Sequence, residues 1–201
     1  KVVGADAFNG CSKLATLWLP AGAALKDGAF SWCRYVKRVT FTGTGAMTDF
    51  TDSYTWTPWY AGCYYNDHEV TVEIMPGVTS IGAHAFHGCA SLVKATVADS
   101  VVKIGASAFE GCSKLGDMEF AQYADEIGEY AFYKCSSATG AVTIKDGMGA
   151  IAAHAFHGCK SFTELTIPNS VKVVGADAFN GCEGLTDATI PGDLTLEDGA
   201  F

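Results

Sequence analysis

Basic residues are scarce in this 201-residue chain, which has 13 Lys and Arg against 22 Asp and Glu and a formal net charge of −9. Nucleic acids and anionic membrane surfaces attract clustered Lys and Arg, so this composition argues against both as partners and favours basic or neutral ones. The chain also lacks an apolar run approaching the roughly 18 residues that a membrane span needs. We therefore expect no direct membrane insertion.

Closely spaced cysteines are also absent, although the chain contains eight cysteines. A zinc cluster needs paired ligands such as Cys-x-x-Cys. Neighbouring cysteines here are 22 residues or more apart in the sequence. The sequence therefore predicts no metal site built on them.

What the chain does contain is a repeat, because the pentapeptide Ala-Phe-x-x-Cys recurs about every 23 residues and every cysteine belongs to one copy. Such self-similarity is typical of a solenoid, in which successive turns bury their apolar side chains against each other. We expect residues 1–201 to form a single solenoid of about eight to nine repeats. The copies begin at Ala7, Ala29, Ala85, Ala108, Ala131, Ala155 and Ala178, with a degenerate copy at Trp59 and a truncated one at Ala200.

Each repeat has the pattern of three short sides. Leu165-x-Ile167 alternates as a strand with one buried face does, and Pro168 ends it, which predicts one short parallel strand per turn. Val171-x-x-Val174 predicts a second extended piece, and Ala178-Phe179 followed by Cys182 suits a tight helical turn or 3-10 segment. The expected fold class is an α/β solenoid dominated by β-structure.

The phenylalanine and cysteine of each copy are expected to form columns in the core, because no single repeat can bury them alone. We favour free thiols that serve as small apolar fillers. Disulfides between neighbouring turns stay an alternative, since the spacing of about 4.8 Å permits them, but parallel side chains disfavour them. The expected core residues are Phe8, Phe30, Phe86, Phe109, Phe132, Phe156, Phe179, Cys89, Cys112 and Cys159.

The full repeat, from Cys through Leu, Ile-Pro and Ile-Gly to Ala-Phe, resembles the BspA-like, Treponema-type class of leucine-rich repeats over nearly the whole chain. The resemblance implies a right-handed superhelix with its short parallel strands on the concave face. It also implies a cell-surface protein that binds extracellular matrix, other cells or proteins, and it brings no catalytic residues. The departures are the segment between Phe41 and Glu73, and Ala152 in place of glycine.

The two ends of the chain resemble each other. Residues 1–11 are identical to residues 172–182, which indicates a recent internal duplication. The sequence begins and stops within a repeat, without the polar terminal turns that close natural arrays. We expect it to be an excerpt of a longer array.

An irregular insertion at residues 42–68 interrupts the repeat and is rich in aromatic residues. Such rings make rigid, amphipathic surfaces for protein or sugar recognition. The alternative is that they fill the core where the repeat is disrupted. The aromatic residues that we assign to a binding surface on this hypothesis are Tyr54, Trp56, Trp59, Tyr64 and Tyr65.

Outward-facing strand positions form a second candidate binding surface. The alternation of the strands aligns one such position per turn, and we expect the file to line the sheet at a spacing of about 4.8 Å. A threonine file could meet an extended partner, although threonine is also a common solvated strand residue. The file contains Trp18, Thr40, Glu73, Thr96, Glu119, Thr143, Thr166 and Thr189.

Catalytic or cofactor-binding patterns are not apparent. His84 with His87, and His154 with His157, have a spacing that could chelate a metal, but the two pairs lie about 14 Å apart at strand spacing and cannot share one ion. We interpret them as exposed histidines copied with their repeat. No serine has a recurring acid and histidine arrangement around it, so we expect neither an enzyme nor a cofactor.

The sequence therefore favours a non-catalytic recognition module of an extracellular or cell-surface protein, which binds a protein or glycan through the strand face and the aromatic insertion. The alternative is a structural or scaffold subunit of a larger assembly, for which the alternative location is intracellular or organellar.

Overall fold

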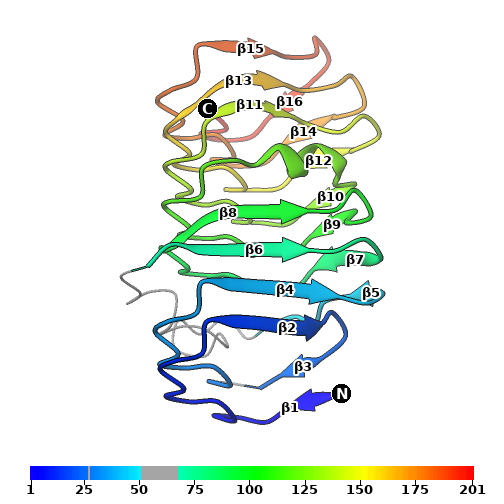
Figure 1. Ribbon diagram of the computed structural model, residues 1–201. Coiled ribbons are helices and arrows are strands. Elements are labelled where there is room, and N and C mark those ends of the chain that lie inside the picture. Colours follow the sequence, from blue (N-terminus) through cyan, green and yellow to red (C-terminus); the bar gives the residue numbers. More distant parts are fainter. Residues whose placement is uncertain (27, 51–67) are drawn as a thin grey trace.

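The computed structural model describes residues 1–26, 28–50 and 68–201 (Figure 1). They form a β-solenoid of about eight turns with parallel strands and almost no helix, as the repeat predicts. Successive turns lie one upon the next from the N-terminal end to the C-terminal end of the stack. The handedness of the superhelix and the concave placement of the strands stay predictions.

One side of the stack carries the longer strands, in two parallel sheets of order β2-β4-β6-β8 and β11-β13-β15. Their side chains alternate between the core and solvent, as in β2, where Leu17 and Leu19 are buried and Trp18 is exposed. The expected short parallel strand per turn is therefore present in most turns. The bounds are β2 (Thr16–Pro20), β4 (Arg38–Thr42), β6 (Val70–Ile74), β8 (Leu92–Val97), β11 (Gly140–Thr143), β13 (Phe162–Thr166) and β15 (Asp187–Thr189).

A second side carries short strands, which also pair in parallel. They form the sheets β1-β3, β5-β7-β9-β10 and β12-β14-β16. These are the second extended pieces that the repeat predicts. Their bounds are β1 (Val2–Val3), β3 (Ala24–Leu25), β5 (Gly45–Ala46), β7 (Val78–Ile81), β9 (Lys103–Ile104), β10 (Glu126–Ile127), β12 (Ala150–Ile151), β14 (Val173–Val174) and β16 (Thr195–Leu196).

The third side consists of successive β-turns, so the prediction of a short helical or 3-10 side is wrong. In the Phe86 turn, the N–H groups of His87 and Cys89 bond to carbonyls three residues earlier, whereas those of Phe86 and Gly88 bond to the next turn. His84 has a φ of 56° and Gly88 a φ of 70°, both left-handed. A 3-10 helix keeps its donors within itself, and this segment gives every second one to its neighbour.

One turn departs from the pattern of the others. Glu119 was expected at an outward-facing strand position, but η1 (Glu119–Tyr123) is a 3-10 helix. It lies between β8 and β11 in the stack (Figure 1). The two sheets of longer strands are separate because of this helix.

Stacked phenylalanine rings run through the core. The ring centroids of Phe109 and Phe132 are 5.5 Å apart, and those of Phe132 and Phe156 are 5.3 Å apart. Phe86 and Phe179 are equally buried. Phe8, by contrast, was expected in the core but is 43% exposed, because it stacks on Phe30 on one side only. Phe30 itself is 2% exposed.

Cysteines form a second buried column. Cys33, Cys112, Cys135 and Cys159 are buried free thiols, and Cys182 is partly buried and free. Cys89 is also buried, but it is disulfide-bonded, so the expectation of free thiols is wrong there. The argument from parallel side chains assumed regular repeats, and the repeat that precedes Cys89 is the irregular one in the sequence.

Candidate functional site

Most residues of the expected outward-facing file are paired with each other between neighbouring strands of the two sheets. In the first sheet, Trp18 pairs with Thr40, Thr40 with Glu73, and Glu73 with Thr96. In the second sheet, Thr143 pairs with Thr166 and Thr166 with Thr189. Trp18 is 65% exposed, and the side chains of Thr96, Thr143, Thr166 and Thr189 are exposed.

Two members of this file differ from the expectation. Thr40 is fully buried although it points away from the core. Its partners in the strands on either side are Trp18 and Glu73, which have larger side chains. Glu119 is exposed, but it lies in η1 and not in a strand. The file is therefore split into two segments, one on each sheet.

A neighbouring file, which the sequence analysis missed, gives the same face a division of charge. In the first sheet Arg38 pairs with Thr71 and Thr71 with Lys94. In the second sheet Ala141 pairs with Glu164 and Glu164 with Asp187. This neighbouring file is therefore basic on β4 and β8 and acidic on β13 and β15, while Glu73 of the first file adds a negative charge on β6. The sequence does contain this second file, because each of its residues stands two positions before a member of the expected file.

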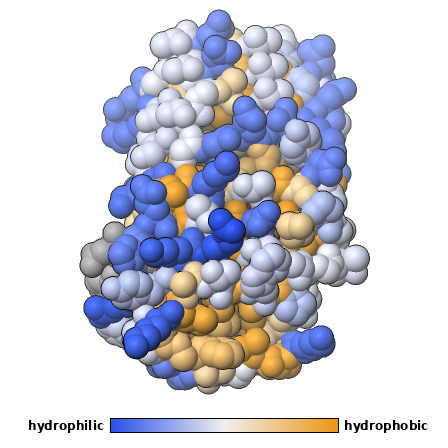
Figure 2. Space-filling view, in the orientation of Figure 1, coloured by the Kyte–Doolittle hydropathy of each residue, from blue (hydrophilic) through white to orange (hydrophobic). Residues whose placement is uncertain are grey.

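Hydropathy also varies along the stack. Figure 2 shows apolar residues gathered at the N-terminal end, over β1–β3, and hydrophilic residues across the middle of the same view. A partner that lies along this face would meet an apolar end, a charged centre and threonine-rich strands.

A shallow depression of about 260 Å³ lies where the two sheets part. It is bordered by β8 and by the segment that contains η1. Lys94, Asp117 and Glu119 are the charged residues of its lining, and Tyr123 is an exposed aromatic one. The depression thus joins Thr96 and Glu119 from the expected file with residues that the sequence analysis did not assign to a site. Its lining residues are Lys94, Ala95, Thr96, Val97, Asp117, Glu119, Phe120 and Tyr123.

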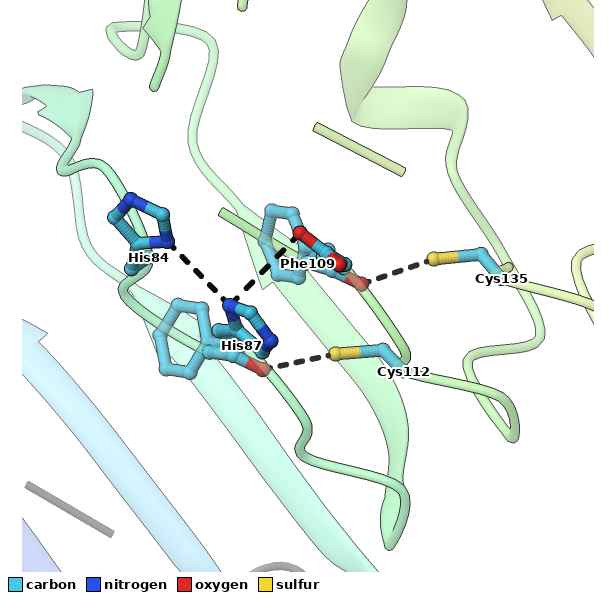
Figure 3. Close-up of polar contacts among 7 residues, drawn as sticks. His84, His87, Phe109, Cys112 and Cys135 are labelled. Atoms are coloured by element: carbon cyan, nitrogen blue, oxygen red, sulfur yellow. Dashed lines mark hydrogen bonds and ion pairs between the residues drawn. The ribbon is translucent and has the colours of Figure 1, made fainter. Parts of the chain in front are cut away.

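The histidines lie on the side made of β-turns, and the expectation that they are exposed is wrong. His87 is 7% exposed, and His84, His154 and His157 are partly buried. The Nδ1 atoms of His84 and His87 are 3.4 Å apart, and Nδ1 of His87 lies 3.9 Å from the Glu110 carboxylate (Figure 3). Burial is the main cause that lowers the pKa of His87, and the charge of Glu110 opposes it.

The second histidine pair stacks on tyrosines of the preceding turn. The rings of His154 and Tyr130 are 4.5 Å apart, and those of His157 and Tyr133 are 4.9 Å apart. Nδ1 of His154 lies 3.8 Å from Asp177. These contacts give the histidines packing roles that their copying within the repeat did not reveal.

The aromatic insertion cannot be placed on this surface. Tyr54, Trp56, Trp59, Tyr64 and Tyr65 all lie outside the described residues. Across residues 1–26, 28–50 and 68–201, His, Cys, Asp and Glu side chains do not gather in the groups of three that could hold a metal ion. In the same ranges, no helix is long and apolar enough to span a bilayer.

Comparison with known families gives a match over nearly the whole chain. A family described as "BspA type Leucine rich repeat region (6 copies)" matches residues 1–53, 59–142 and 126–201. A search of curated proteins found no match.

Several solved structures have a similar fold. A leucine-rich repeat protein of T. pallidum has a TM-score of 0.66 at 22% identity, over 79% of this chain and 72% of that one. Leucine-rich repeat proteins of Eubacterium ventriosum and Bacteroides ovatus have TM-scores of 0.58 and 0.55 at 15% and 19% identity. Those matches cover 89% and 96% of this chain but only 49% and 53% of the chains compared.

Proposed function

Because this chain belongs to the BspA-type leucine-rich repeat family, we propose that it is a non-catalytic recognition module that binds a protein or a glycan. The binding surface is the outer face of the two sheets. Trp18, Thr96, Thr143, Thr166 and Thr189 supply its central file. The insertion residues Tyr54, Trp56, Trp59, Tyr64 and Tyr65 supply a second, aromatic contact.

The observation that carries this proposal is the exposed, in-register face itself. The threonines of β11, β13 and β15 are directly paired from strand to strand and are all exposed. Side chains fixed on parallel strands about 4.8 Å apart need little further ordering when a partner binds. Many weak polar contacts along such a face therefore add to a useful affinity.

We place this function outside the cell or at the cell surface, as the resemblance of the repeat implies. A scaffold subunit of a larger assembly would use the same face as a permanent interface. A free recognition module should be monomeric and soluble alone, whereas a scaffold subunit should purify with fixed partners. Size-exclusion chromatography with light scattering of the protein from its native source separates the two.

Glu164 and Glu129 provide a matched pair for testing the binding face. Both are exposed; Glu164 lies on β13 next to Asp187, whereas Glu129 lies in the β-turn that follows β10. The protein is applied to an array of extracellular matrix proteins and glycans, and the ligand that it captures is titrated. We expect Glu164→Arg to weaken that binding at least tenfold and Glu129→Arg, with the same charge change, to leave it intact.

Both variants should unfold at the same temperature as the wild-type protein, because neither side chain is buried. Equal binding by the two variants, or greater loss in Glu129→Arg, would place the partner on another face. Capture that persists after both substitutions would contradict the strand face as the recognition surface.

A further inference from the structure

The break between the two sheets leaves two strands with a hydrogen-bonded neighbour on one side only. β8 is the last strand of the order β2-β4-β6-β8, and β11 is the first of β11-β13-β15. Between them lie residues 116–124, the part of one turn that takes the place of a strand (Figure 1). Parallel strands normally exchange backbone bonds at every second residue, so the missing strand leaves donors and acceptors unused.

The backbone bonds show where pairing stops. The Gly116 N–H donates to the Val93 carbonyl at 3.2 Å, and the Thr139 N–H donates to the Gly116 carbonyl at 3.1 Å. These two bonds join three successive turns at Val93, Gly116 and Thr139. Beyond these bonds, no backbone bond among the described residues joins the segment 117–124 to Ala95 or Val97 of β8.

Alternation along β8 fixes the direction of the unused groups. The Ala98 N–H bonds to Ile74 of β6, and the Val93 carbonyl bonds to the opposite side. Because successive residues of a strand alternate in direction, Ala95 and Val97 direct their N–H and C=O groups away from β6. These groups face the depression between β8 and η1, which both residues line.

The local sequence explains why the strand is lost. Asp117 accepts the N–H of Glu119 at 2.8 Å through its carboxylate, a bond that favours a turn over an extended strand. Phe120 then enters the core, where its ring lies 5.4 Å from that of Phe109 and 5.9 Å from that of Phe132. The chain folds into η1 to bring that ring inward.

The helix η1 is held toward the C-terminal sheet. Lys145, which follows β11, donates to the Tyr123 carbonyl at 3.2 Å and pairs with Asp125 at 2.5 Å. The opening therefore lies on the β8 side of η1, where the depression of about 260 Å³ is found. Pockets for drug-sized ligands usually measure about 300–1,000 Å³ and are more enclosed, so this site suits a short stretch of chain better.

We propose that an extended peptide segment bearing basic side chains adds to the edge of β8, pairing its backbone with Ala95 and Val97. This proposal rests on the recognition function above and names its partner class. Backbone pairing supplies affinity in such strand addition, and alternate side chains supply specificity. Asp117 and Glu119 give the lining two negative charges against the one positive charge of Lys94, and Glu73 lies beside Thr96.

The probe is a fluorescent, capped hexapeptide of alternating valine and lysine, titrated by anisotropy. Two further peptides carry N-methyl groups on all valines or on all lysines. Since alternate N–H groups of a strand point to the same side, one methylated peptide loses the bonding donors and the other keeps them. We expect binding to fall at least tenfold in one of the two series only.

Protein variants locate the peptide. Val97→Pro removes an edge donor that makes no bond with the described strands, and proline is tolerated at such positions. We expect it to weaken binding at least tenfold. Ala188→Pro makes the same change on β15, an edge strand of the other sheet, and should leave binding unchanged. Glu119→Lys should weaken binding and reduce its salt dependence, which serves as the test if Val97→Pro does not fold.

Equal loss for both methylated peptides, or loss in Ala188→Pro instead of Val97→Pro, would overturn the proposal. So would a folded Val97→Pro protein that binds as the wild type does. If the wild-type chain binds no hexapeptide while Glu164→Arg still abolishes capture of a ligand on the array, strand addition at β8 is wrong and the recognition function stands.

Discussion

The thiol of Cys135 donates to the backbone carbonyl of Phe109, one turn earlier in the stack, with a sulfur to oxygen distance of 3.2 Å (Figure 3). The same carbonyl accepts the N–H of Cys112 at 3.0 Å. Equivalent bonds of 3.1–3.2 Å link each of the other partners in the series: Cys33 to Phe8, Cys112 to Phe86, Cys159 to Phe132 and Cys182 to Phe156. The cysteine thus joins two turns and does more than fill space.

Replacing Cys135 by alanine removes both the bond and part of the packing. Hydrogen bonds contribute about 0.5–1.5 kcal/mol net, and a thiol is a weak donor. We expect a loss of about 1–2 kcal/mol in the free energy of unfolding, measured by urea denaturation. Cys11→Ala serves as the control, since Cys11 is exposed and should change little. Equal losses in the two variants would show that the column does not stabilise the stack.

Phe109 should be among the most sensitive positions, because its ring is fully buried between Phe86 and Phe132. Phe109→Ala is expected to cost about 3–5 kcal/mol and to raise hydrogen exchange in the turns on either side. Phe8→Ala, at a ring that is 43% exposed, should cost less. Unchanged exchange protection in the adjacent turns would argue against mutual support of the turns.

Thiol reactivity should follow burial. Burial raises the pKa of Cys112, Cys135 and Cys159, and it raises the pKa of Cys182 to about 12. Because the thiolate is the reactive form, iodoacetamide at pH 8 should label the exposed Cys11 first and leave the buried thiols unlabelled until the chain unfolds. Peptide mapping by mass spectrometry reads the order. Rapid labelling of Cys135 in the folded protein would be incompatible with the buried column.

Stability should depend on pH through His87. Its pKa in the folded protein is lowered below the ordinary value of 6.5, mainly by burial. Below that pH the unfolded chain therefore binds the proton more readily than the folded one. The contribution of neutral His87 to the free energy of unfolding is complete above pH 6.5 and is lost as the pH falls toward the folded-state pKa.

Urea denaturation between pH 7.5 and 5 checks this dependence. His87→Gln should lower the loss of stability on acidification, because glutamine does not titrate. His154→Gln keeps His87 in place and should retain the wild-type slope. The assignment to His87 fails if its replacement leaves that slope unchanged.

Much of the fold follows from the sequence, because the spacing of Ala-Phe-x-x-Cys sets the number of residues in each turn. The period of two in the strands then fixes which residues point outward, and the pairing of Thr143 with Thr166 and Thr189 follows from it. These predictions depend only on alternation and on regular stacking, which one repeat shares with the next.

What the sequence did not reveal depends on contacts between different turns. The pattern at Met118 and Phe120 is compatible with a strand, and the η1 helix forms because the Phe120 ring packs against two core phenylalanines. The turn side has the length of a 3-10 segment, yet its alternate N–H groups bond to the following turn. Burial of Thr40 and His87 likewise depends on neighbours one turn away, which a single repeat does not contain.

The opposite charges on the strand face give the stack a polarity for anything that lies along it. Arg38 and Lys94 are carried by the first sheet, and Glu164 and Asp187 by the second. A ligand with acidic groups at one end and basic groups at the other is therefore attracted in one orientation and repelled in the reverse. On the proposed binding face, this arrangement would distinguish the head of an elongated molecule from its tail, even where both fit the same strands equally well.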